Sequence, residues 1–203
     1  MWDNKGSIIF RVQQPLATDT APLLSVLNHY HQRLENLFLC QQEALVEQRF
    51  ELASQLLSHY QALLSAHIQL ENSLLLPLHE KVEKPRWASS LYLREHEKIL
   101  TLVSRAKEKL DAAQSEEGRS PRRGAIALLD YQRTIKGVLE HHEQREEQGL
   151  VPELSAMLDL SEEIKLAAQL EALWQQSFAE RQDALNALLT QLDLDGLSYT
   201  TKL

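Results

Sequence analysis

The chain has only one cysteine, Cys40, among its 203 residues. A single thiol excludes a disulfide framework within the chain and any zinc site built from several cysteines. Glycine and proline are also scarce, with six of each. Leucine, alanine, glutamate and glutamine dominate instead, and this composition favours helix over sheet.

Long apolar runs and an excess of positive charge are missing as well. No stretch approaches the length of a membrane span, and the run Ile8-Ile9-Phe10 is too short for the core of a signal peptide. The net charge of −8 gives no reason to expect nucleic acid or an anionic membrane as a partner. We therefore expect a cytoplasmic protein whose length suits one domain with a sizeable core.

Apolar residues recur every three or four positions along most of the chain, which predicts an all-α fold. Four long helices are predicted, at 21–47, 50–77, 87–114 and 121–148. Because the connections are short, these helices should pack as an up-down-up-down four-helix bundle. We expect a lead-in at 1–19, the bundle at 20–155 and a C-terminal helical extension at 160–195.

The predicted helix boundaries rest on a few local signals. Pro77 is expected to end or kink the second helix, since proline cannot continue a helix normally. Gly149 and Pro152 are expected to stop the fourth. A fifth helix should begin at Ser161, followed by two glutamates that suit a first turn.

One motif, His-x-x-x-Glu-x-x-x-x-x-Pro, occurs twice, at 67–77 and 142–152. Four residues advance a helix by about 400°, so the histidine and glutamate of each copy point the same way. In the first copy they continue the apolar stripe of Leu56, Tyr60 and Leu63. Such polar side chains belong in a core only if something offsets their desolvation. A His/carboxylate pair on the core face, found twice, suggests a buried metal.

Counting residues from each connection predicts that four histidines meet. His31 and His67 lie about 17 and 19 residues from the turn near residue 48, and His67 and His96 each lie about 14 from the middle of the next connection. His96 and His142 each lie about 23 from the third turn. Equal distances from a turn mean equal height in an antiparallel bundle. All four should therefore converge with Glu71 and Glu146.

These six residues, and the prolines that follow each glutamate, resemble the hemerythrin-like (HHE cation-binding) family. The resemblance covers roughly residues 20–155 and includes an internal duplication, in which residues 31–34 are echoed by 96–99. It implies a non-haem di-iron centre. Each iron would be held by two histidines, with Glu71 and Glu146 as bridging carboxylates. Zinc and manganese also accept imidazole and carboxylate ligands.

The chain departs from the oxygen-carrying members of that family at one position. Those proteins have a further histidine one turn after the position of His96, where this chain has Leu100. Four histidines and two glutamates are closer to the iron-centre-repair and nitric-oxide-responsive members. However, residues 1–20 lack the cysteine-bearing segment of the repair proteins. With two histidines each, both irons would keep an open position for a small diatomic ligand, O2 or NO.

Two functional hypotheses follow from the resemblance and the composition. The first is a di-iron protein that reacts with or senses O2 or NO, more a metal-binding or sensing protein than a turnover enzyme. The second is a regulatory module with a structural metal site, in which the C-terminal helix reports metal or redox state to a partner. That helix should either pack across the bundle through Trp174 and Phe178 or form a homodimer with a second copy.

Several other polar residues are open to alternative readings. His29 could replace His31, which is preferred because it fits the apolar stripe and matches His96. Glu35, one turn after His31, could be an extra ligand but is more simply an exposed carboxylate. The remaining residues in question are expected to be exposed (His59, His79 and His141) or to pack in the core (Cys40, Tyr92 and Tyr131).

Overall fold

The structure is a computed structural model, which describes residues 22–115 and 120–192. Its regular elements there are all helical, as predicted for an all-α protein. In chain order they are α1 Pro22–Val46, α2 Phe50–Leu70, the π-helix η1 Glu71–Leu75, α3 Leu76–His79, α4 Ser89–Ser115, α5 Pro121–Arg145, the π-helix η2 Glu146–Leu150, α6 Val151–Met157 and α7 Leu160–Leu189. The predicted lead-in 1–19 and the residues after 192 lie outside the described part.

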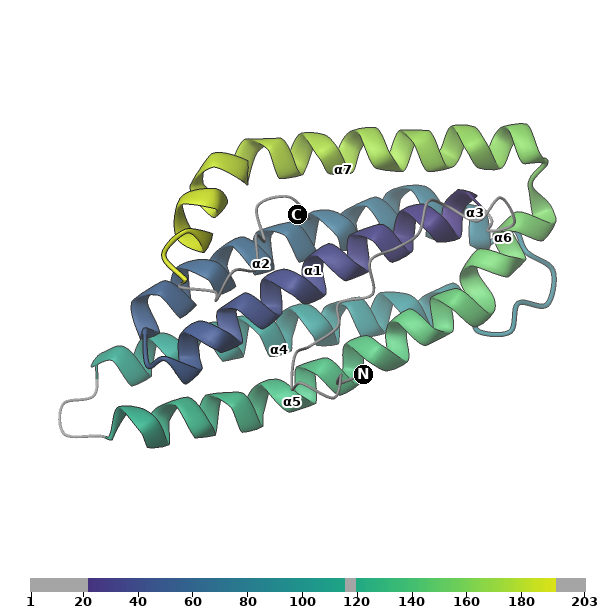
Figure 1. The fold of residues 1–203 in the computed structure, drawn as a ribbon. Helices are drawn as coiled ribbons and strands as arrows, with labels where there is room; N and C mark the ends of the chain where they lie inside the picture. The colour runs from purple at the N-terminus through teal and green to yellow at the C-terminus, as the bar shows by residue number, and fades with distance from the viewer. Residues whose placement is uncertain (1–21, 116–119, 193–203) are drawn as a thin grey trace, which may run out of the picture.

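The four long helices α1, α2, α4 and α5 lie lengthwise beside one another (Figure 1). Contacts link α1 to α2, α2 to α4, α4 to α5 and α5 back to α1. Apolar side chains from all four fill the space between them, including Leu27, Tyr60, Ile99 and Ile135. The predicted polar convergence therefore falls within a continuous apolar core.

The end predicted for the second helix lies two residues from the observed one, whereas the end predicted for the fourth is wrong. Beyond Leu70 the helical path continues through η1 and α3 to His79, and beyond Arg145 it continues through η2 and α6 to Met157. Gly149 and Pro152 thus do not stop the fourth helix.

Each proline is accommodated by a wider turn just before it. The Leu76 N–H bonds the Glu71 carbonyl, five residues back, and the Val151 N–H bonds the Glu146 carbonyl in the same way. Pro77 and Pro152 then stand in the first turn of a new α-helix. A backbone N–H has no helical partner there, so proline is tolerated.

The last helix, α7, starts with a capping box at Asp159. The Asp159 side chain accepts from the Glu162 N–H at 2.8 Å, and the Glu162 carboxylate accepts from the Asp159 N–H at 2.9 Å. These bonds satisfy two otherwise free backbone donors. They start the helix at Leu160, one residue before the predicted Ser161.

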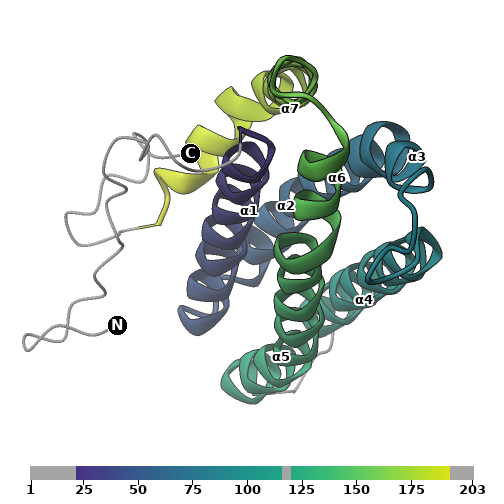
Figure 2. The same ribbon diagram turned by 90° about the vertical axis from the view of Figure 1, so that its right-hand side faces the viewer.

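Helix α7 packs lengthwise on α1 and α2, outside the four long helices (Figure 2). Its buried face includes Leu170, Trp174, Phe178 and Leu185, and Trp174 is fully buried. Of the two arrangements expected for this helix, packing across its own chain is the one observed. A homodimer through this helix stays a prediction.

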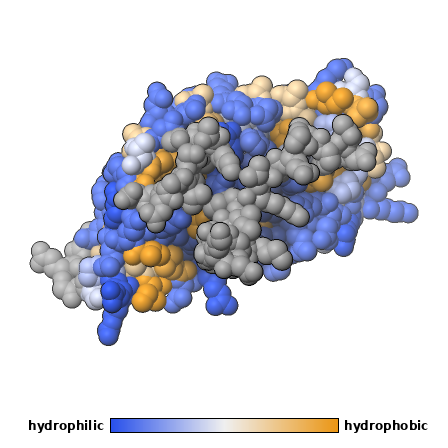
Figure 3. Space-filling model, in the orientation of Figure 1, coloured by the Kyte–Doolittle hydropathy of each residue, from blue (hydrophilic) through white to orange (hydrophobic). Residues whose placement is uncertain are grey.

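The face of the molecule seen in Figure 3 is mainly hydrophilic where it is coloured, with separate apolar patches. Met157, Leu160 and Ile164, around the junction of α6 and α7, are among the exposed apolar residues. Within the described ranges, no helix combines the length and the apolar character needed to cross a bilayer.

Candidate metal centre

Six side chains predicted to converge are brought together in the core by six different elements. His31 comes from α1, His67 from α2, His96 from α4 and His142 from α5, whereas Glu71 and Glu146 are the first residues of η1 and η2. His31 is 10% exposed through its side chain, and the other five are exposed by 4% or less. The prediction that the four histidines lie at the same height along their helices is therefore correct.

The histidines form two pairs, each joined through Nε2 atoms. His31 Nε2 lies 3.0 Å from His67 Nε2, and His96 Nε2 lies 3.1 Å from His142 Nε2. We name the first pair position A and the second position B.

Each carboxylate has one oxygen at each position. Glu71 places Oε1 3.2 Å from His67 Nε2 and Oε2 3.1 Å from His96 Nε2. Glu146 places Oε1 3.0 Å from His142 Nε2 and Oε2 3.3 Å from His31 Nε2. Both carboxylates thus span the two positions. At position B the four donors lie within reach of one common ion, whereas at position A His31, His67 and Glu71 do so and Glu146 approaches only His31.

These distances suit atoms that share an ion. Two ligand atoms about 2.0–2.2 Å from one metal, at right angles, lie about 3 Å apart. Although the nitrogen and oxygen atoms are this close, none of the four carboxylate oxygens is hydrogen-bonded within the described residues. Buried carboxylates without hydrogen bonds are costly unless a cation offsets the charge. The residues present therefore fit a metal, and this buried cluster could hold one.

The pKa values of the metal-free cluster show how the six groups share protons. Burial, followed by the charge of His67, lowers the pKa of His31 to about 3, so His31 is neutral and able to bind a metal. Burial, followed by the charge of Glu71, raises the pKa of Glu146 to about 8. Burial also opposes a charge on His142, but Glu146 outweighs it and raises the pKa of His142 well above its ordinary value. The Glu146–His142 pair consequently holds a proton at neutral pH.

Glu71 behaves differently from Glu146. Burial disfavours its charge, but the neighbouring histidines, His67 first, outweigh burial and hold the pKa of Glu71 below its ordinary value. One carboxylate is thus ionised and the other is protonated. Two buried carboxylates that face each other separate in this way because both cannot ionise freely without a cation.

Both glutamates begin a π turn, and this feature was not predicted. In each copy of the motif, the α-helix is regular up to the residue before the glutamate, and the π turn then runs from the glutamate to the residue before the last α-helical piece. Single π turns inside helices are often found at functional sites. The spacing from Glu to Pro is the same in both copies. Each proline therefore follows a π turn at the same distance.

At position B the Nδ1 atom of each histidine, on the side away from the centre, has a hydrogen-bond acceptor. His96 Nδ1 lies 2.7 Å from Asn72 Oδ1, and His142 Nδ1 lies 3.1 Å from Glu95 Oε2. Arg145 forms an ion pair with the other Glu95 oxygen. Because these acceptors take the Nδ1 proton, they leave Nε2 free to face the centre. Sequence reasoning missed Asn72 and Glu95, although each is adjacent in sequence to a predicted ligand.

Position A lacks an equivalent support on His67. The His67 Nδ1 atom is buried and has no hydrogen-bond partner in the described part of the chain. Its ring instead packs edge-on against Tyr30 and Trp174, both at centroid distances of 6.0 Å. Tyr30 and Trp174 stack on each other at 4.6 Å. Thus α7 reaches the centre through an aromatic contact with a candidate ligand.

The alternatives for helix α1 are resolved by geometry. His29 and Glu35 are both exposed, and neither belongs to the groups of donor atoms that lie within reach of a common ion. His31 is therefore the histidine of α1 that joins the cluster.

Outside the centre, one expectation about exposure is wrong. His79 is fully buried, where its ring lies 2.8 Å from Ser89 Oγ and 2.7 Å from Glu153 Oε2. It is buried because the helical path continues past Pro77 and carries His79 against α4 and α6. His141 is exposed as expected, and His59 is half-buried.

The residues expected to pack in the core behave largely as predicted. Cys40 and Tyr92 are fully buried, and Tyr131 is half-buried. The Tyr92 hydroxyl donates to the Arg145 carbonyl at 3.3 Å.

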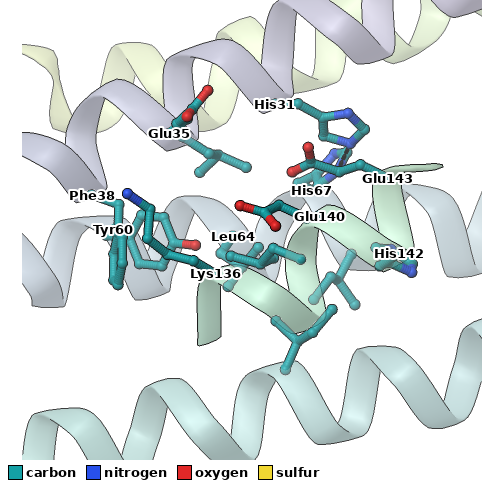
Figure 4. Close-up of a pocket in the computed structure, with 14 residues that line it drawn as sticks. His31, Glu35, Phe38, Tyr60, Leu64, His67, Lys136, Glu140, His142 and Glu143 are labelled. Carbon is teal, nitrogen blue, oxygen red and sulfur yellow. Dashed lines mark hydrogen bonds between the residues drawn. The ribbon is translucent and has the colours of Figure 1, made fainter. Parts of the chain in front are cut away.

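A pocket of about 240 Å³ adjoins the centre (Figure 4). His31, His67 and His142 line it, together with apolar side chains of α1, α2, α4 and α5. Glu35, Lys136, Glu140 and Glu143 supply charged groups. A ligand could therefore reach the histidine cluster from this side.

The chain was compared with models of known protein families, with curated proteins and with solved structures, and none of them matches.

Proposed function

We propose that the six converging residues bind two iron ions in a hemerythrin-like four-helix bundle, and that the centre reacts with or senses O2 or NO. One observation carries this proposal: each of Glu71 and Glu146 has its two oxygens directed to different histidine pairs. A single ion would need only one such position. Two positions spanned by two carboxylates favour two ions.

The donor set also bears on the metal. Imidazole and carboxylate ligands suit iron, zinc and manganese, and the absence of thiolates disfavours sites that select soft metals. Iron would supply an open coordination position and a change of oxidation state for O2 or NO. The chain itself would contribute four neutral imidazoles, two bridging carboxylates and a largely dry surrounding. Leu100, one turn after His96, cannot donate a further ligand, so the chain offers two histidines to each position.

Metal analysis tests this proposal directly. Protein purified without chelators, or loaded anaerobically with Fe²⁺, should contain about two iron ions per chain. The reduced, iron-loaded protein should then change its absorption spectrum on addition of O2 or NO. One tightly bound zinc ion, or no metal above background after loading, would refute the di-iron assignment.

A second function, a metal-responsive regulatory module, is favoured by the contact between α7 and His67. Trp174 lies fully buried against this candidate ligand, so metal binding could alter how α7 packs. Hydrogen exchange of α7 with and without metal tests this alternative. Protection of α7 that does not depend on metal would contradict it.

A further inference from the structure

We propose that the pocket beside position A binds a small organic molecule with an apolar body and a hydrogen-bond-accepting head group. The head would contact Tyr60 and Lys136, and the apolar end would point to the histidine cluster. Occupation of the pocket stands on its own geometry, whereas the orientation toward a metal rests on the proposed function.

The first observation is the size and the shape of the pocket. Its volume of about 240 Å³ is far more than a diatomic ligand needs, since a cavity of about 150 Å³ accommodates benzene. Tyr60 and His67 both line it and are seven residues apart on α2, which corresponds to about 10 Å along the helix. The pocket therefore suits an elongated molecule of six to ten or so non-hydrogen atoms.

The second observation is the Tyr60 hydroxyl. Tyr60 is only 1% exposed, and its hydroxyl makes no hydrogen bond within the described part of the chain. Figure 4 shows this hydroxyl on the side of the ring that faces Leu64 and Lys136, which also line the pocket. Burial raises the pKa of Tyr60, so the hydroxyl keeps its proton and acts as a donor. This hydroxyl is not one of the fully buried atoms without a partner, so it is accessible from the pocket, and a ligand acceptor could bind it.

Lys136 adds further donors at the same end. Its only hydrogen bond in the described residues is a long one, 3.5 Å to Gln42 Oε1. An ammonium group has three donors and no acceptor. In Figure 4 Lys136 lies beside Phe38 and Tyr60, whereas His31, His67 and His142 lie at the opposite end. The donors and the candidate metal ligands are thus separated by an apolar stretch that includes Leu64 and Ile99.

Three glutamates also line the pocket, so a cationic ligand is the rival. Glu35 and Glu140 are exposed and screened by solvent, whereas Tyr60 and Lys136 lie together at the head end of the pocket (Figure 4). These two donors favour an acceptor head over an ammonium head there.

Binding of three six-carbon probes, 1-hexanol, hexanoate and hexylamine, to the full-length metal-free protein tests the proposal by ligand-observed NMR. We expect saturable binding of 1-hexanol and weaker binding of hexylamine. Hexanoate binding tighter than 1-hexanol would assign the head to Lys136, and the reverse order would assign it to Tyr60. No saturable binding of either acceptor probe, or tightest binding of hexylamine, would overturn the proposal.

Variants locate the site. Tyr60→Phe should weaken 1-hexanol binding about two- to tenfold, the effect of losing one hydrogen bond. The matched control is Tyr131→Phe, because the Tyr131 hydroxyl donates to the Leu102 carbonyl outside this pocket. Leu64→Phe should block the pocket, and Ile99→Phe provides a second blocking variant on α4. Binding that survives both blocking changes in folded protein would place the probe elsewhere.

Paramagnetic broadening tests the orientation separately. In Co²⁺-loaded protein the terminal methyl group of bound 1-hexanol should broaden more than the CH2 group next to the hydroxyl. The opposite order would refute the orientation. If the protein takes up no metal, the proposed function fails, but probe binding to the metal-free protein still decides whether the pocket is a ligand site.

Discussion

Positions A and B are approached by the same kinds of protein donor but have different surroundings. Each is approached by two imidazole nitrogens and one oxygen from each of Glu71 and Glu146. Behind position B, Asn72 and Glu95 accept from the outer nitrogens of the histidines. Behind position A, the outer nitrogen of His67 has no hydrogen-bond partner among the described residues, its ring packs on Tyr30 and Trp174, and the pocket opens beside it. The internal duplication therefore repeats the ligands but not the groups that hold them.

This difference teaches that equal ligand counts do not make two equivalent sites. An acceptor behind a metal-bound histidine orients the ring and increases its basicity, and its loss typically costs about 10–100-fold in metal affinity. We therefore expect position B to fill first and to hold its ion more tightly. We expect position A to exchange its ion more readily and to meet external ligands.

Removing a carboxylate that serves both positions should weaken both A and B, and this change should have the largest effect on metal content. Glu71→Ala or Glu146→Ala takes one oxygen from each position, so the metal content should fall from about two ions per chain to one or fewer. Elemental analysis after anaerobic loading measures this content. Glu35→Ala is the matched control on α1 and should keep both ions. Loss of metal in Glu35→Ala would mean that the ligand assignment on α1 is wrong.

Chelation should lower stability in two steps. A metal that binds only the folded state at 100 times its Kd adds about 2.7 kcal/mol, or about 5–10 °C in Tm for a chain of this size. Most helix content should remain at room temperature in far-ultraviolet circular dichroism. Returning one equivalent of metal should restore part of the Tm, and a second equivalent the rest. An unchanged Tm after verified metal removal would contradict burial of the six groups in one core.

Glu95→Gln should weaken position B selectively. The amide keeps the shape but loses the charge that supports His142, so the tighter of the two binding steps should weaken by about tenfold or more. Calorimetric titration with Zn²⁺ measures both steps. The exposed Glu97, on the same helix α4, provides the control Glu97→Gln. If only the weaker step changes in Glu95→Gln, the order assigned to A and B is reversed.

Acidification by a single pH unit should weaken metal binding by the smallest of these factors. The pKa of Glu146 in the metal-free protein is about 8, so below that pH a metal must displace its proton. Affinity should rise by about tenfold per pH unit up to about pH 8, then level off as Glu146 loses its proton unaided. Calorimetry in buffers of different ionisation enthalpy would count the proton released. No proton release at pH 7 would show that Glu146 is ionised before the metal arrives.

Much of the centre could be predicted because it depends on long-range regularities. Apolar periodicity locates the helices, and connection lengths set the heights of His31, His67, His96 and His142. The π turns could not be predicted, because proline alone does not show whether a helix ends or widens. The prediction that His79 is exposed was wrong for the same reason, since its burial depends on the helical path beyond Pro77.

The hydrogen-bond acceptors of the position B histidines were not predicted either. Asn72 and Glu95 are next to predicted ligands in the sequence, but neighbours on a helix point about 100° apart. Their contacts with His96 and His142 depend on the rotation of each helix relative to the others. A rotation of that kind is set by core packing and has no local sequence signal.

The stacking of Trp174 near His67 has a practical consequence for optical spectroscopy. Open-shell metal ions quench indole emission at short range, and the Trp174 ring lies 6.0 Å from a candidate ligand ring. The chain contains only two other tryptophans, Trp2 and Trp87. The fluorescence of Trp174, isolated by replacing those two with phenylalanine, would report in real time when position A gains or loses an open-shell metal ion. The protein thus contains its own indicator for the more exchangeable half of the centre.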